Sequence, residues 1–113
     1  MAEYVLNMEA YMEERYYLTV THIDSYAGCG MFRPGMILRM KKDHENPYDD
    51  EAIAVYGNRD AKYGYVANST HSVCRGTHSA GYFQHLFGEE AQCIVLFVAD
   101  DLAIAELIQE SEK

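Results

Sequence analysis

The fold of this chain is decided by the stretch DHENPYDDEAIAV, residues 43–55, in which a polar turn runs directly into an apolar strand. Pro47 fixes its own φ angle and keeps Asn46 out of the α region. Asp49 is placed to hydrogen-bond the backbone of the turn. Tyr48 is therefore expected to stand on a stiff loop, as a ring that is free to stack on a flat ligand.

Alternating apolar residues predict further strands on both sides of this turn. A hairpin turn at residues 57–60 joins two of them, and residues 102–108 predict either a last strand or a short helix. Five or six short strands are typical of a small barrel or a strongly bent sheet. The predicted strands cover residues 16–23, 36–42, 52–56, 62–67 and 91–99.

Two short helices are expected between the fourth and fifth strands. Ser69 or Thr70 would cap a single turn that ends at Gly76, and Ser79 would cap a longer helix that ends at Gly88. One face of this longer helix would carry four apolar or aromatic residues. They are Tyr82, Phe83, Leu86 and Phe87.

The length of 113 residues fits one domain. Residues 16–113 are predicted to form it, and residues 1–15 to form a short helix or arm before it. The chain carries 18 acidic and 9 basic residues, for a net charge of −9. Such a surface repels phosphate at long range, which argues against strong non-specific binding of nucleic acid.

The cysteines and the N-terminus predict a cytoplasmic protein. Cys29, Cys74 and Cys93 are odd in number and share no C-x-x-C spacing, so a disulfide framework is not expected. The first residues lack the basic start and apolar core of a signal peptide. Every apolar run is shorter than the roughly 20 residues that span a bilayer.

Three segments in this order resemble the HIRAN domain: the turn over residues 46–49, the strand over residues 52–55, and Gly64-Tyr65 in the next strand. The resemblance extends from residue 16 to about residue 108. It implies a mostly β fold, a small modified OB-like β-barrel of five to six strands with two short helices inserted before the last strands. HIRAN domains occur in DNA-repair helicase-like proteins and as stand-alone bacterial proteins, and this chain is similar to the latter.

The resemblance also implies a nucleic-acid site for a single-strand end or distorted DNA. In the best-studied branch of the family, the turn contacts the terminal nucleotide of a 3′ end. Tyr48 would then stack on a base, Asp49 would accept a hydrogen bond from the terminal hydroxyl, and Asn46 would shape the loop. Tyr26 and Phe97 would supply further rings.

The chain departs from that branch where phosphate-facing groups are expected. Asp24 and Ser25 stand where the branch has an Arg-Tyr pair, Tyr65 replaces a histidine, and Asn68 replaces a lysine. These departures predict weaker binding of phosphate. The alternative is that the turn only orders the connection between two strands.

A second candidate is a metal site formed by His71, Cys74, His78 and His85, which lie within fifteen residues. Imidazole and thiolate are ligands that suit zinc or a similar divalent ion. Surface histidines and a core cysteine would give the same pattern. His22 shares the register of apolar strand residues, which predicts a core histidine.

The sequence contains neither of two common catalytic motifs, the Gly-x-Ser-x-Gly elbow and the H-E-x-x-H helix. We therefore expect a binding module without enzymatic activity. A third interpretation is a protein-interaction adaptor whose acidic face pairs with a basic partner.

Overall fold

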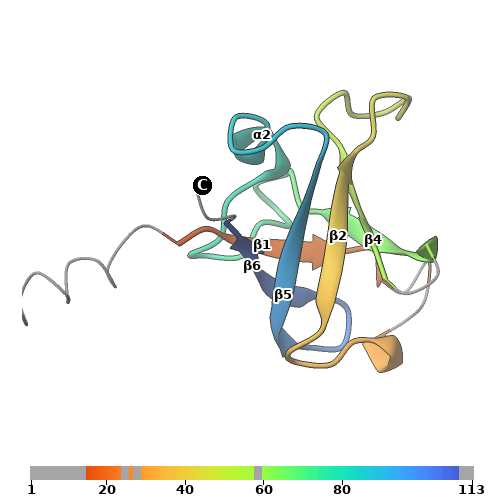
Figure 1. Ribbon diagram of the computed structural model, residues 1–113, viewed down its shortest axis with the longest axis vertical. Coiled ribbons are helices and arrows are strands. Elements are labelled where there is room, and N and C mark those ends of the chain that lie inside the picture. Colours follow the sequence, from red (N-terminus) through yellow and green to blue (C-terminus); the bar gives the residue numbers. More distant parts are fainter. Residues whose placement is uncertain (1–14, 24–25, 27–28, 58–59, 110–113) are drawn as a thin grey trace, which may run out of the picture.

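Six antiparallel strands close into one barrel in the computed structural model, which describes residues 15–23, 26, 29–57 and 60–109. The order around the barrel is β1-β4-β3-β2-β5-β6. Figure 1 shows β2 beside β5, with α2 towards one end of the barrel. The elements are β1 (Tyr17–Thr21), η2 (Cys29–Met31, a 3-10 helix), β2 (Ile37–Lys42), β3 (Ile53–Tyr56), β4 (Lys62–Val66), α2 (Ala80–Phe83), β5 (Glu90–Val98) and β6 (Ala103–Ile108).

Every second side chain of most strands faces the barrel interior, as the pleat of a strand requires. In β6, for example, Ala103 and Ala105 are fully buried while Ile104 between them is only partly covered. This alternation is the pattern that predicted the strands. The barrel core includes Leu18, Val20, Leu38, Met40, Ile53, Val55, Cys93, Val95, Ala103, Ala105 and Leu107.

The pairing of β1 with β4 depends on Gly64. A Cβ atom at this position would overlap the carbonyl oxygen of Thr21 and lie 3.1 Å from Cγ1 of Val20. The two strands pair through Val20 with Val66 and through Thr21 with Tyr65. A glycine therefore allows β1 to approach β4 closely enough to close the barrel.

The helical region is shorter than the sequence predicts. Ser79 is the N-cap of α2, and its hydroxyl accepts a hydrogen bond from the N–H of Tyr82 at 3.2 Å, as expected. The helix ends at Phe83, however, so the prediction of a longer helix up to Gly88 is wrong. The expected single turn is capped by Ser69 as predicted, since its Oγ accepts the N–H of His71 at 3.0 Å and its carbonyl accepts the N–H of Val73 at 2.9 Å, but the turn does not continue as a helix to Gly76.

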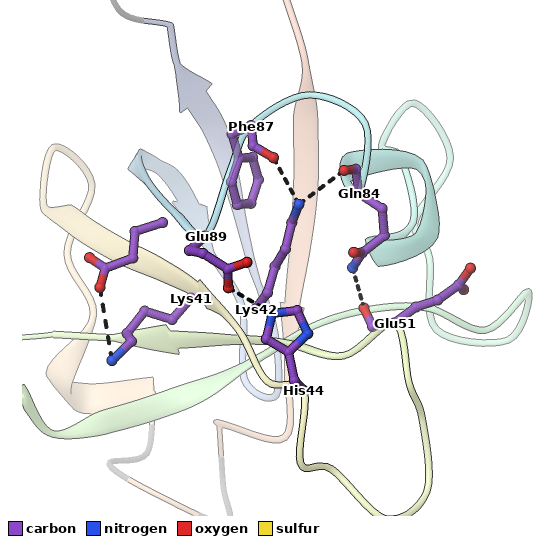
Figure 2. A network of polar contacts seen from close by, with 8 residues as sticks. Lys41, Lys42, His44, Glu51, Gln84, Phe87 and Glu89 are labelled. Atoms are coloured by element: carbon purple, nitrogen blue, oxygen red, sulfur yellow. Dashed lines mark hydrogen bonds and ion pairs between the residues drawn. The ribbon is translucent and has the colours of Figure 1, made fainter.

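Lys42 of β2 gives a physical reason for this early end. Its ammonium donates to the carbonyl oxygens of Gln84 at 3.0 Å and Phe87 at 2.8 Å. In a continued helix the Gln84 carbonyl would accept from the N–H four residues later. Figure 2 shows the ammonium between the two carbonyls, while the Gln84 amide reaches the carbonyl of Glu51. The loop after α2 is thus fastened to β2.

The predicted fold is confirmed as a mostly β, closed barrel of six strands that is consistent with the OB-like architecture. The last element is a strand, not a helix. The predicted arm over residues 1–15 lies outside the described residues except for Arg15, which pairs with Glu106 at 3.2 Å. No helix in the described part of the chain is long and apolar enough to cross a membrane.

Candidate nucleic-acid interface

The turn between β2 and β3 is held by the side chain of Asn46. Its Oδ1 accepts the N–H of Tyr48 at 2.9 Å and the N–H of Asp49 at 3.0 Å. The base of the turn is closed by the N–H of Asp43, which donates to the carbonyl of Ala52 at 2.9 Å. The turn is therefore fixed by its own hydrogen bonds as well as by Pro47.

Tyr48 stands at the tip of this rigid turn. Its backbone is fixed by Asn46, yet its side chain is 94% exposed. Exposure of so large an aromatic ring leaves apolar area in water that a stacked ligand would cover. The expected outward position of the ring is thus what the structure shows.

A groove of about 720 Å³ opens beside Tyr48. Four of the five residues predicted to bind nucleic acid line it, namely Tyr26, Asn46, Tyr48 and Asp49. The rest of the lining comes from the ends of β1 and β4, from the turn itself, and from the loop after β4. These residues are Thr21, His22, Pro47, Ala52, Tyr65, Val66, Ala67, Asn68, Ser69 and Ser72.

Asn68 holds the carboxylate of Asp49 at the groove wall. Its amide donates to Asp49 Oδ2 at 3.0 Å and Oδ1 at 3.3 Å, and to Glu51 Oε1 at 3.1 Å. Asp49 Oδ1 also accepts the N–H of Glu51 at 2.9 Å. A carboxylate offers about four acceptor positions, so Oδ2 keeps capacity for one further donor. Asp49 can therefore accept a ligand hydroxyl.

Tyr65 of β4 forms part of the groove wall together with Tyr26, with ring centroids 6.2 Å apart. Its hydroxyl donates to Asp43 Oδ2 at 3.0 Å and accepts from Lys62 Nζ at 2.9 Å. Burial raises the pKa of Tyr65, and the hydrogen bond to Asp43 adds to this, whereas Lys62 opposes it. The phenol is thus neutral at pH 7 and available as a polar ring.

His22 lies in the groove, so the prediction of a core histidine is wrong. It follows the last residue of β1 with a φ of 63° and is exposed to solvent. Its ring meets Tyr65 edge-on at 6.5 Å between centroids. The alternating pattern of the sequence continues to residue 23, two residues beyond the end of β1 at Thr21, and the positive φ of His22 takes its side chain out of the strand register.

Phe97 is the predicted binding residue that the structure does not bring to the groove. It lies on β5, where it pairs with Ile104 of β6 and is 58% exposed. It is absent from the described lining of the groove. The register of β5 shifts between Val95 and Phe97, an irregularity that the sequence pattern does not reveal.

The four residues of the predicted metal site are placed separately. His78 stacks on Tyr82 with centroids 3.9 Å apart, and His71 and His85 are exposed. Cys74 is a half-buried free thiol. Among the described residues, no three His, Cys, Asp or Glu side chains are grouped so that they would hold a metal ion. The structure therefore lends this prediction no support.

Comparison with known proteins agrees with this geometry. A closed small barrel with an aromatic-walled groove defines a class of binding module. The model of the HIRAN domain matches residues 14–75, more than half of the chain, so the chain belongs to the HIRAN family. Membership in this family indicates nucleic acid as the ligand class.

A solved structure shares the fold. The crystal structure of a protein from Lactobacillus plantarum aligns with a TM-score of 0.54 and 22% identity, over 83% of this chain and 93% of that one. No curated protein matches the chain.

Proposed function

We propose that the groove binds the 3′ end of a single-stranded nucleic acid, with Tyr48 stacking on a base, and that it does so without a catalytic step. The observation that carries the proposal is the fully presented ring of Tyr48 at the rim of a groove that also contains Tyr26 and Asp49. Single-strand binding on small barrels combines such rings with polar groups.

Asp49 supplies the preference for an end. A 3′-terminal nucleoside carries a hydroxyl that an internal nucleotide lacks, and Asp49 Oδ2 retains room to accept its hydrogen. A terminal phosphate would instead place negative charge against this carboxylate. We therefore expect an oligonucleotide with a 3′-hydroxyl to bind more tightly than the same strand with a 3′-phosphate.

The first test is fluorescence anisotropy at low salt with a short labelled strand. Tyr48→Ala is expected to weaken binding by about 1–3 kcal/mol, or about 5- to 150-fold, which is the value of one base stack. Phe97→Ala, which removes an exposed ring outside the groove, serves as the matched control and is expected to bind like the parent. Equal losses in both variants, or no saturable binding by the parent, would reject the proposal.

The second test compares the two kinds of 3′ end. Asp49→Asn is expected to abolish the preference for the hydroxyl end, while Asp50→Asn removes the same charge from an exposed neighbour and keeps the preference. If the parent binds the 3′-hydroxyl and 3′-phosphate strands equally, the groove does not distinguish between the two kinds of 3′ end. Pairing of the acidic surface with a basic protein, the other predicted role, stays a prediction.

A further inference from the structure

Lys62 is not itself a lining residue of the groove, but its side chain lies over two rings that form the groove wall. Its ammonium is 4.8 Å from the ring centroid of Tyr65 and 5.6 Å from that of Tyr26. Both rings belong to the groove wall. At these distances the positive charge is attracted by the ring faces, which helps to keep the long side chain over them.

A hydrogen-bonded chain fixes the position of this ammonium. Lys62 donates to the hydroxyl of Tyr65, and Tyr65 donates in turn to Asp43. Because the phenol hydrogen is committed to Asp43, the oxygen presents a lone pair to the lysine. An ammonium has three N–H donors, and Tyr65 is the one hydrogen-bond acceptor that Lys62 has among the described residues. Within that part of the chain, two of its donors make no hydrogen bond and can serve a ligand.

Most other basic side chains of the described residues differ from Lys62 because carboxylates or backbone carbonyls already occupy them. Arg15, Arg39 and Lys41 are paired with carboxylates, and Lys42 is held by two backbone carbonyls. Among the residues that the structure describes, Lys62 reaches a carboxylate only through the Tyr65 hydroxyl. The hydrogen bond to Tyr65 raises the pKa of Lys62, so the group is charged at neutral pH.

We infer that Lys62 contacts a backbone phosphate of the strand in the groove, and that Tyr65 and Asp43 are positioning residues that hold its ammonium over the two rings. This inference rests on the proposed function and names the part of the ligand that this edge of the groove recognises. The ligand is thus a nucleotide chain with a phosphate beside the stacked bases, and not a free nucleoside.

One phosphate contact has a measurable signature in salt. For single strands, the slope of log affinity against log salt changes by about 0.7 for each phosphate that a cation neutralises. The negative net charge of the whole protein affects the parent and every variant of equal charge alike. The difference in slope between such variants therefore isolates the local contact.

The experiment measures binding of a 3′-hydroxyl oligonucleotide by anisotropy over a range of NaCl concentrations. Lys62→Gln is expected to weaken binding at the lowest salt and to make the slope more positive by about 0.7. Lys62→Arg keeps the charge and is expected to keep the slope of the parent. Lys41→Gln removes one charge from β2, where the lysine faces Glu90, and is expected to leave the slope unchanged.

Tyr65→Phe tests the positioning role. It removes the hydroxyl while the lysine keeps its charge, so the ammonium is no longer held beside the phosphate. The slope is therefore expected to move from that of the parent towards that of Lys62→Gln, with a loss of affinity at low salt. Melting temperatures of all variants verify that they are folded. A slope for Lys62→Gln equal to that for Lys41→Gln would overturn the inference and leave the proposed function standing. Absence of saturable binding by the parent at every salt concentration would overturn both.

Discussion

Asn46 shows how much of the groove depends on one side-chain atom. Its Oδ1 accepts the N–H groups of both Tyr48 and Asp49, which are the residues assigned to the base and to the terminal hydroxyl. A loss of these bonds would free the turn without removing either functional side chain. The residue thus links the stability of the turn to binding.

We expect Asn46→Ala to lower the free energy of unfolding by about 1–2 kcal/mol, because two N–H groups lose their acceptor. Asn46→Asp keeps an acceptor oxygen at the same place and is the matched control, since aspartate forms the same kind of turn. Urea denaturation of the two variants measures the difference. Identical midpoints for alanine and aspartate would show that the bonds contribute nothing.

At the scale of secondary-structure elements, Gly64 sets the distance between β1 and β4. These strands also deliver Thr21 and Tyr65 to the groove, so their spacing fixes one of its walls. Val20 and Thr21 leave no space for a Cβ atom at this glycine. The close approach of β1 to β4 at Gly64 is therefore needed both to close the barrel and to form this wall of the groove.

Gly64→Ala is expected to destabilise the protein by about 1–3 kcal/mol, the usual cost of forcing an extra methyl group into a packed site. Gly88→Ala is the control, because a Cβ atom there has no neighbour within 4 Å among the described residues. Chemical denaturation should place this control within about 0.5 kcal/mol of the parent. A Gly64→Ala variant as stable as the control would contradict the close approach.

The strands and the turn could be predicted from the sequence because they depend on local signals: a period of two, a proline and a short run of acceptors. The length of α2 could not, because its end depends on Lys42, which is about forty residues away and donates to two carbonyls of the loop. The same holds for the groove. Tyr48 and Asp49 were predictable from the turn, whereas the contact of Lys62 with Tyr26 exists only once β4 lies beside the first loop.

At the scale of the whole molecule, three titratable groups make the free energy of unfolding decrease as the pH rises above neutral. Burial raises the pKa of Cys93 from its ordinary value of 9.0 to about 12, and the pKa values of Tyr65 and Lys62 are also raised. A raised pKa in the folded state means that the unfolded chain releases its proton first. Stability is therefore full below the unfolded pKa and declines as the pH rises towards the folded value.

For Cys93 this decline spans the interval from pH 9.0 to about 12, with a slope of at most about 1.4 kcal/mol per pH unit. We expect Cys93→Ala to show a shallower alkaline decline in urea midpoint than the parent. Val95→Ala, which truncates an equally buried and non-titrating neighbour on β5, controls for lost packing and should keep the parent's slope. If the urea midpoints of the parent and of Cys93→Ala decline in parallel with pH, titration of Cys93 does not contribute to the alkaline loss of stability.

Closure of the barrel has a consequence for recognition. Each of the six described strands has a partner on both sides, so the described sheet has no free edge strand. An extended peptide therefore finds no open sheet margin on which to lie as a seventh strand. Recognition by this barrel is therefore expected to use side chains and loops and not an added strand.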